Sequence, residues 1–229
     1  MHNFLLTEDG SHTLLNEKWQ VTYHSKFGAL QESNTVYINA GFNHLLNKLL
    51  GENPQLSVLE MGFGTGLNTF LTYLRTIKYP HIKVKYTGID AYPISLQMAE
   101  KLNYPETLQV DDARDIFLKM HSSTPNEWIP LSENFTFRRI EEKIETLDFQ
   151  NQLFDLIYFD AFAPNAQPEL WDEHLMQKLF NLLRPNGVLT TYCAKGDFKR
   201  LLKSIGFVVE SLPGPKGKRE MTRATKPFI

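Results

Sequence analysis

The stretch that most constrains the fold is residues 57–68, which read SVLEMGFGTGLN. It opens with an apolar run of the length expected for a buried parallel strand, and the acid Glu60 lies near the end of that run. Three glycines follow at alternate positions, and they are Gly62, Gly64 and Gly66. An apolar helical pattern begins just after Asn68. A strand, a glycine turn and a helix in this order are typical of a nucleotide-binding crossover, because backbone without side chains can approach a ligand closely.

The spacing of the glycines indicates which ligand the turn binds. A phosphate-binding loop would end in Gly-Lys-Ser/Thr, and a dinucleotide-binding turn would need a glycine where this chain has Leu67. The remaining pattern, E-x-G-x-G-x-G, is associated with S-adenosylmethionine (SAM) in methyltransferases. Because SAM has no phosphate but carries an amino group and a sulfonium, an acid beside the turn favours it. We therefore expect Glu60, the three glycines and Asn68 to bind SAM.

A second acid supports a nucleoside ligand. Residues 84–92 (VKYTGIDAY) are predicted to form the next strand, with Asp90 at its C-terminal end. A carboxylate about 20 residues after a glycine turn can accept hydrogen bonds from the ribose hydroxyls. A nicotinamide cofactor would need the same acid, so Asp90 predicts nucleoside binding, and the glycine spacing favours SAM.

Composition excludes several other classes of protein. A chain of 229 residues, 42% of them hydrophobic, is long enough for one sizeable domain. No apolar run approaches the roughly 18 residues of a membrane span, and residues 1–10 lack the pattern of a signal peptide. The single cysteine, Cys193, excludes a disulfide framework and a thiolate zinc site. We therefore expect a cytoplasmic protein with no metal and no membrane partner.

The order of patterns predicts an α/β fold. We expect residues 1–50 to form a small β-rich extension packed on the core, with strands at 19–23 and 35–39 and a helix at 40–50. From residue 51 to 229, strands and helices alternate, which predicts a mostly parallel sheet covered on both faces, with ligands at the C-terminal strand ends. Further strands are predicted at 135–140, 154–160, 188–193, 207–211 and 219–224, and helices at 95–102, 168–183 and 197–205. Residues 103–134 interrupt the alternation, with a helical pattern at 116–120, and insertions of this length are usually functional or mobile.

Acids follow the predicted strands in order: Glu60, Asp90, Glu141 or Glu142, and Asp160. Any one of them could cap the next helix. Because parallel strands end at one edge of a sheet, the four positions together predict an acidic rim. Glu141 or Glu142 would lie where SAM-binding enzymes hold the adenine amino group, and the sequence leaves open which of the two does so.

The segment after the last of these acids, residues 160–171, reads DAFAPNAQPELW. Pro164 and Pro168 predict a rigid, extended loop directly after a buried strand. One interpretation is a stiff connection with Trp171 packed beneath it. The other is an acceptor loop that presents Asp160 to the methyl-receiving atom, with Phe162 and Pro164 against the substrate.

Methyl transfer from SAM is an in-line displacement, so the protein mainly orients and desolvates the reacting groups. An alkylamine acceptor has a pKa near the lysine value of about 10, and only its neutral form attacks. A carboxylate at Asp160 would hold the ammonium and raise its pKa, and it could also take the proton as attack begins. We therefore expect Asp160 to be the catalytic residue and to lie beside the cofactor.

Charge is unevenly distributed along the chain. The formal net charge is −2, yet residues 195–229 carry nine basic residues and three acids. A local basic segment in an otherwise acidic protein indicates either RNA binding through phosphate contacts or a solvated edge. The candidate RNA-binding cations are Lys195, Lys216, Lys218, Arg219 and Arg223.

Five segments together resemble the methyltransferase domain of the MnmC type, which acts in tRNA wobble-uridine modification. They are DGSHTL (9–14), YHSKFGALQES (23–33), LEMGFGTGLN (59–68), DAFAPNAQPELW (160–171) and PGPKGKREMTRA (213–224), and the resemblance extends over about residues 7–226. The glycine motif is general to SAM enzymes, whereas DAFAP and PGPKGKREM are more specific. The resemblance implies a class I SAM-dependent methyltransferase fold, Rossmann-like, with a seven-stranded sheet whose last strand is antiparallel.

The resemblance also implies an activity, which is N-methylation of 5-aminomethyl-2-thiouridine at the wobble position, giving 5-methylaminomethyl-2-thiouridine. It implies the tRNA anticodon stem-loop as partner, Glu60 and the glycines as SAM contacts, Asp90 at the ribose and Asp160 at the methyl-transfer centre. Well-known members also carry an FAD-dependent oxidase domain. Here we expect a stand-alone form, with a separate enzyme that supplies the aminomethyl precursor.

Two other functions remain open from the residues alone. One is a SAM-dependent methyltransferase or aminopropyl-type transferase that acts on a small amine, which would need the acidic rim but not the basic segment. The other is a non-catalytic RNA-binding domain, since a fold does not determine a function.

Overall fold

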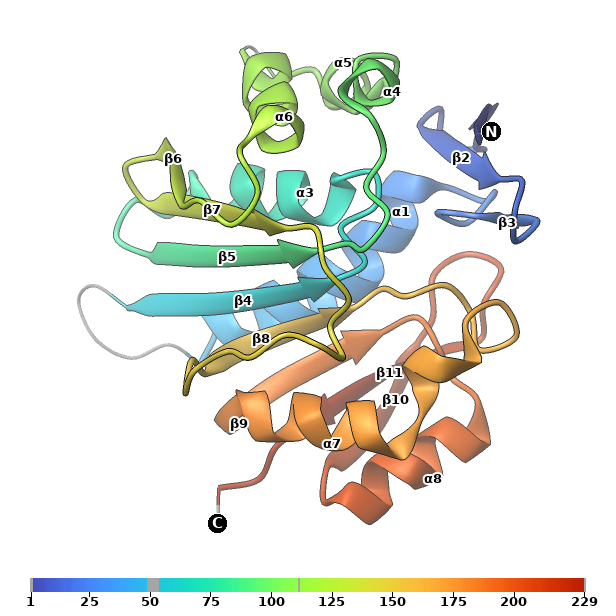
Figure 1. The fold of residues 1–229 in the computed structure, drawn as a ribbon, viewed down its shortest axis with the longest axis vertical. Helices are drawn as coiled ribbons and strands as arrows, with labels where there is room; N and C mark the ends of the chain where they lie inside the picture. Colours follow the sequence, from blue (N-terminus) through green and yellow to red (C-terminus); the bar gives the residue numbers. More distant parts are fainter. Residues whose placement is uncertain (1, 49–53, 111, 229) are drawn as a thin grey trace.

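The computed structural model describes residues 2–48, 54–110 and 112–228. Its centre is an eight-stranded sheet with the strand order β10-β11-β9-β8-β4-β5-β7-β6 and helices on both faces (Figure 1). The strands are β4 (Gln55–Met61), β5 (Lys83–Ile89), β6 (Ile129–Ser132), β7 (Phe135–Ile140), β8 (Phe154–Phe159), β9 (Leu183–Thr191), β10 (Val208–Pro213) and β11 (Glu220–Thr225).

The sheet is mostly parallel, as predicted. Strands β7, β5, β4, β8 and β9 run parallel to one another, and β11 is antiparallel to both β9 and β10. Together with β10, these six strands make the predicted seven-stranded sheet, and β11, the last strand in the chain, is the antiparallel one. Strand β6 adds an eighth, antiparallel strand beside β7. It contains Pro130, which an edge strand tolerates because its missing N–H can face away from the sheet.

Two apolar cores lie on the two faces of the sheet. One packs the helices η1 (Asn34–Asn43), α3 (Leu67–Thr76) and α6 (Ala113–Ser122) against one face. The other packs α7 (Glu173–Leu182) and α8 (Gly196–Ile205) against the opposite face. Side chains alternate between faces along each strand, so Val58 of β4 joins the first core and Leu59 the second. The remaining helical segments are α1 (Ala29–Ser33), α2 (His44–Leu46), α4 (Leu96–Ala99), α5 (Tyr104–Leu108) and the 3₁₀ turn η2 (Pro168–Trp171).

In the N-terminal region, strands β1 (His2–Leu6), β2 (His12–Asn16) and β3 (Val21–Thr22) form a small separate antiparallel sheet (Figure 1). These strands differ from those expected, because β1 and β2 were not predicted and the strand predicted at 19–23 is only β3. The predicted strand at 35–39 is wrong, because these residues belong to the π-helix η1. Its apolar side chains, such as Val36, are buried against the main sheet, and this packing overrides their β propensity.

Other predicted boundaries of helices differ from those of the structure. The helix predicted at 40–50 starts earlier, because α1, η1 and α2 follow one another without a break. Residues 49–53, which include the predicted domain boundary, lie outside the described residues. The division into an extension (1–50) and a methyltransferase domain (51–229) therefore stays a prediction. The helix predicted at 168–183 is two segments, since the Asp172 side chain accepts a hydrogen bond from Leu175 N (2.8 Å) and starts α7 anew. Within the described ranges, every helix is too short or too polar to cross a bilayer.

Candidate active site

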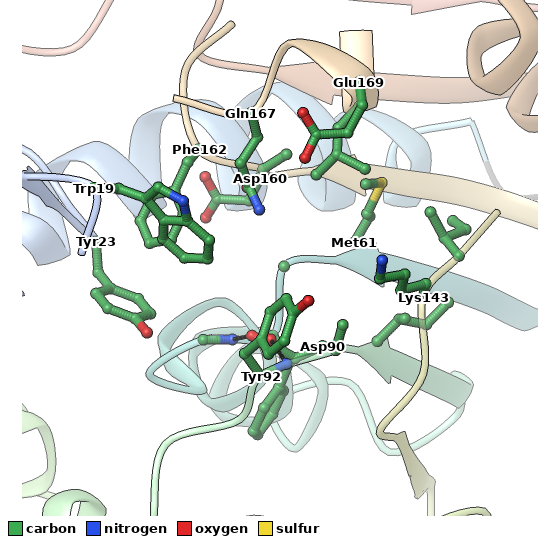
Figure 2. Close-up of a pocket in the computed structure, with 18 of the residues that line it drawn as sticks. Trp19, Tyr23, Met61, Asp90, Tyr92, Lys143, Asp160, Phe162, Gln167 and Glu169 are labelled. Atoms are coloured by element: carbon green, nitrogen blue, oxygen red, sulfur yellow. Dashed lines mark hydrogen bonds between the residues drawn. The ribbon is translucent and has the colours of Figure 1, made fainter. Parts of the chain in front are cut away.

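A cavity of about 270 Å³ opens at the C-terminal ends of the central strands. Its walls come from the glycine turn after β4, the segment that follows β5, the loop after β7 and the DAFAP segment after β8. N-terminal residues on either side of β3 complete the wall (Figure 2). This is the edge of the sheet where ligands bind in open α/β folds, and it is where the sequence predicted the acidic rim.

Because residue 62 is glycine, the turn after β4 can pass very close to the DAFAP segment after β8. Its φ is +92°, and a Cβ at this position would lie 2.3 Å from the carbonyl oxygen of Asp160. Only glycine fits there without a shift of backbone. The turn is held from the other side as well, because Gly62 N and Phe63 N both donate to Ile89 O at 2.9 Å. Helix α3 then begins at Leu67, after Gly66.

Asp90 lines the cavity, as predicted. Its Oδ2 accepts a hydrogen bond from Gly64 N (2.7 Å), and its Oδ1 accepts one from Tyr92 N (2.8 Å). Burial raises the pKa of this carboxyl, and the charge of Glu141 adds to the effect, while the two backbone N–H groups lower it. Each oxygen retains a lone pair beyond the backbone bond, so the carboxylate can also accept from the hydroxyls of a ribose.

Asp160 also lines the cavity and is held by two neutral donors. The Tyr37 hydroxyl donates to Oδ1 at 2.6 Å, and the Asn68 amide donates to Oδ2 at 2.8 Å. Figure 2 shows the carboxyl beside Phe162 and Gln167. Burial raises its pKa to about 7, above the usual value of 3.8. A carboxyl of this kind binds a cation well and is a stronger base than an ordinary aspartate.

Glu60 is placed differently from our expectation. It is fully buried and is not among the residues that line the cavity. Its Oε2 accepts hydrogen bonds from Thr69 Oγ1 (2.7 Å) and Tyr86 OH (2.9 Å), on the face of the sheet that packs against α3. The alternation of side chains along β4 explains the difference, because Met61 points to the cavity and Glu60 to the opposite face. Direct contact of Glu60 with SAM is therefore not supported.

The other predicted cofactor residues fall into two groups. Gly62, Gly64, Asp90, Glu142 and Asp160 line the cavity. Gly66, Asn68 and Glu141 do not line it. Glu141 forms an ion pair with Arg139 Nη1 at 2.5 Å, which draws it away and leaves Glu142 at the wall. Of the two acids that the sequence left open for the adenine amino group, the geometry favours Glu142.

An aromatic group at the cavity includes residues that sequence reasoning missed. The Trp19 ring lies 5.3 Å from the ring of Phe162, and the Tyr23 ring lies 5.0 Å from it. Tyr92, 54% exposed, lies 6.1 Å from Trp19. Phe162 is at the cavity as predicted, whereas Pro164 is not among the lining residues. Trp19 and Tyr23 precede the glycine turn by about 40 residues. The family-like segment at 23–33 could have indicated Tyr23, whereas Trp19 lies outside every such segment.

The predicted RNA-binding cations are largely engaged within the protein. Lys216 pairs with Glu8 (2.7 Å), Lys218 with the buried Glu32 (2.6 Å) and Arg223 with Glu210 (2.8 Å). For Arg219 and Lys195, the described residues contain no ion-pair partner within 4.0 Å. None of these five cations lines the cavity. Exposed pairs such as Lys216–Glu8 are weak and can exchange for a phosphate, so RNA binding by this segment stays a prediction.

Comparisons with known proteins show which proteins the chain is similar to. A family model described as S-adenosyl-L-methionine-dependent methyltransferase matches residues 122–227. A relative in Leptospira borgpetersenii serovar Hardjo-bovis, the tRNA 5-methylaminomethyl-2-thiouridine biosynthesis bifunctional protein MnmC, is 28% identical over 224 residues. That match takes in 91% of this chain and 33% of the relative, so the chain spans about a third of the relative's length.

Solved structures confirm the fold. The crystal structure of MnmC2 from Aquifex aeolicus is similar over 100% of this chain and 73% of its own, with a TM-score of 0.77 and 21% identity. Magnesium protoporphyrin IX methyltransferase from Synechocystis PCC 6803, solved with bound S-adenosylhomocysteine, has a TM-score of 0.51 and 12% identity over 86% of this chain and 84% of its own. These structural similarities confirm the class I fold, the curated relative and MnmC2 bear out the resemblance to the MnmC-type domain, and the family model supports SAM as the cofactor.

Proposed function

We propose that this chain is a SAM-dependent methyltransferase, and that it methylates the 5-aminomethyl group of 5-aminomethyl-2-thiouridine at the wobble position of tRNA. The product would be 5-methylaminomethyl-2-thiouridine. The observation that carries the proposal is the Asp160 carboxyl, which faces the cavity directly beside the glycine turn. Similarity to MnmC over 91% of the chain supports this nucleoside as the substrate.

The cavity residues suit SAM as their ligand. Because Gly62 and Gly64 have no side chains, the amino-acid part of SAM could reach the backbone of the turn. Asp90 would accept hydrogen bonds from the ribose hydroxyls, and Glu142 would accept one from the adenine amino group. When bound, SAM supplies an electrophilic methyl group on a positively charged sulfur. An acidic wall stabilises such a cation, and the Asp90 carboxyl contributes to it.

Asp160 would act on the acceptor amine. A primary alkylammonium has a pKa near the lysine value of about 10, and it must lose its proton before the nitrogen can attack. With its pKa at about 7, Asp160 is closer in basicity to the amine than an ordinary aspartate with a pKa of 3.8. It would hold the ammonium first and then take the proton, while Tyr37 and Asn68 keep its two oxygens in place.

The aromatic rings near Asp160 would receive the base. Single-stranded RNA loops are recognised mainly by stacking of unstacked bases on aromatic side chains. Phe162 and Trp19 offer such surfaces beside the carboxyl, as Figure 2 shows. The cation of Lys18, whose Nζ lies 5.0 Å from the centre of the Trp19 ring, would meet the adjacent phosphate of the anticodon loop.

A small amine is the second candidate substrate, for methyl or aminopropyl transfer. The observation that favours it is the pairing of Lys216, Lys218 and Arg223 with acids of the protein, which leaves less free positive charge for RNA. In either case a preceding reaction must supply a free primary amine, and in the tRNA case we propose that a separate activity does so.

Mass spectrometry of nucleosides tests the proposal. tRNA that carries 5-aminomethyl-2-thiouridine is incubated with the protein and methyl-labelled SAM, with Asp160→Asn as the matched control. We expect the labelled methylaminomethyl nucleoside from the wild type, and its rate of formation by the control to be lower by about 100-fold or more. Label on small amines and none on the tRNA would instead identify the second candidate. SAM binding without either product would indicate a non-catalytic or different role.

A further inference from the structure

The DAFAP segment brings three chemically different side chains to the cavity. Asp160 brings a carboxyl and Phe162 a ring, and Gln167 of the same segment lines the cavity with an amide. Figure 2 shows the Gln167 side chain beside the Asp160 carboxyl. The other residues of this segment at the cavity are two apolar residues and one acid, namely Ala161, Leu170 and Glu169. An amide is the one group among these that offers a hydrogen-bond donor and an acceptor side by side.

The Gln167 amide is not used by the protein itself. Within the described parts of the chain, neither its nitrogen nor its oxygen has a hydrogen-bond partner. Only the backbone of Gln167 is engaged, because its N–H donates to Ala163 O (3.1 Å) and its carbonyl accepts from Leu170 N (3.2 Å). The residue is half-buried, so a ligand that fills the cavity would take water away from the amide. Since an unpaired polar group is costly once water is excluded, the ligand must present matching groups.

The backbone that carries these side chains is held by donors from two other parts of the chain. The Tyr192 hydroxyl, which follows β9, donates to Ala161 O at 2.7 Å. The indole Nε1 of Trp171, in η2, donates to Phe162 O at 2.9 Å. Two successive carbonyls are therefore fixed by side chains. The amide of Gln167 consequently lies on the same rigid support as the carboxyl and the ring, which is the condition for reading a ligand by hydrogen bonds.

The proposed substrate has a matching edge beside its amine. The aminomethyl group is attached to C5 of the base, and the neighbouring ring atom C4 carries O4. When the amine meets Asp160, the nearest heteroatom on the edge of the base is therefore O4, an acceptor, followed by the N3–H donor. An amide complements this pair, because its NH₂ group can donate to O4 while its oxygen accepts from N3–H.

We propose that Gln167 is a specificity-determining residue that binds the O4 and N3–H edge of the target base and so selects uracil over cytosine. The inference rests on the proposed function and deepens it. Asp160 would hold the amine and Phe162 the face of the base, and neither of these contacts distinguishes the two pyrimidines. The edge does distinguish them, and Gln167 is the group that the DAFAP segment places there.

The orientation of the amide gives the selection its direction. Cytosine presents the reverse pattern, with the N4 amino group as donor and N3 as acceptor. To pair with it, the Gln167 amide would have to turn its oxygen toward the Asp160 carboxylate. Two acceptors without a proton between them repel each other, so the amide is expected to keep its NH₂ group on the side of Asp160.

A pair of synthetic anticodon stem-loops tests the inference. One carries 5-aminomethyluridine at the wobble position and the other 5-aminomethylcytidine, and kcat/KM is measured for both with each variant. The ratio of the two values cancels effects on SAM binding, on folding and on Asp160 that are common to both substrates. We expect the wild type to prefer the uridine by about tenfold or more.

Two substitutions of Gln167 should change this ratio in different ways. Gln167→Leu keeps the size of the side chain but removes both hydrogen bonds, so the ratio should fall to within about threefold of one. Gln167→Glu offers acceptors only, so the ratio should shift further and favour the cytidine, whose N4 can donate to a carboxylate. Gln97→Leu is the matched control, because Gln97 is exposed and is not among the cavity-lining residues, and its ratio should equal that of the wild type. Calorimetry should show SAM affinity within about threefold of wild type for all three variants.

The failure of this inference can be told apart from the failure of the tRNA reaction. If the wild type methylates both stem-loops without preference, or if both Gln167 variants keep the wild-type ratio, Gln167 does not read the base, although the proposed reaction stands. If the wild type methylates neither stem-loop, the proposed reaction is contradicted and the inference falls with it.

Discussion

The hydroxyl of Tyr37 lies 2.6 Å from Oδ1 of Asp160, although the two residues are 123 positions apart in the chain. Tyr37 lies in the π-helix η1, and Asp160 follows strand β8. Burial keeps the pKa of Tyr37 well above 10, so its O–H is a permanent donor at any physiological pH. The N-terminal helical segment therefore takes part in the active site through one hydrogen bond.

Removing that hydroxyl should impair chemistry and leave cofactor binding intact. Tyr37→Phe removes a donor that lowers the pKa of Asp160, so the pKa of the carboxyl should rise. We expect kcat to fall about tenfold and the acidic limb of the pH–rate profile to move to higher pH. Tyr79→Phe is the matched control, since Tyr79 is not among the cavity-lining residues. A profile that stays in place would show that the Tyr37 bond does not tune Asp160.

Asp160→Asn should separate catalysis from cofactor affinity. The amide keeps the size of the side chain but can neither hold an ammonium by charge nor take its proton. We expect kcat to fall by about 100-fold or more, with SAM affinity within about threefold of wild type. In the wild type, activity should decline as pH falls below about 7, where the carboxyl becomes protonated. Equal losses in kcat and SAM affinity would instead make Asp160 a cofactor ligand.

Gly62→Ala should damage the site through a backbone clash. The new Cβ would lie 2.3 Å from the Asp160 carbonyl oxygen. The alanine would also either be strained at the φ of +92° or shift the backbone away from this angle. We expect a loss of about 1–3 kcal/mol in unfolding free energy and weaker SAM binding by calorimetry. Gly10→Ala is the control, since Gly10 also has a positive φ of +81° but no atom lies within 4 Å of its Cβ position. Equal effects of the two changes would mean that the close approach to Asp160 is unimportant.

The C-terminal cations differ in what their loss should do. Arg219→Gln removes a cation without an ion pair in the described structure, so it should raise KM for tRNA in a salt-dependent way and leave stability unchanged. Lys218→Gln removes the ion-pair partner of the buried Glu32, 2.6 Å away, and leaves it only the hydrogen bond from Ser25 N, so it should also lower the melting temperature. Kinetics at several salt concentrations and thermal unfolding measure the two effects. Unchanged KM in both variants would favour the small-amine substrate.

Periodicity was sufficient to predict the main sheet and two of its acids. Asp90 and Asp160 follow apolar strands, and parallel strands bring their ends together at one cavity. The same reasoning failed for Glu60, because an acid one residue before the strand end points to the opposite face. The position within the period of two decides this, but a strand that is buried on both faces, such as β4, does not show in its sequence which face meets the cavity.

Long-range packing set what the sequence could not. Residues 35–39 have strand propensity, yet they lie in η1 because that segment packs across the main sheet. Trp19 reaches the cavity from a segment with no sequence link to the glycine turn. The placement of Glu141 away from the cavity is a local effect, because the guanidinium of Arg139, two residues earlier, pairs with it. The first two outcomes depend on contacts between residues far apart in the sequence, and the third on a side-chain arrangement that only the folded chain defines.

A crystal structure of the protein with S-adenosylhomocysteine tests the central claim most directly. We expect the ligand in the cavity after β4, with its ribose hydroxyls on the Asp90 carboxylate and its sulfur facing Asp160. Density for the ligand at another place, or in this cavity without contact to Asp90, would contradict the account.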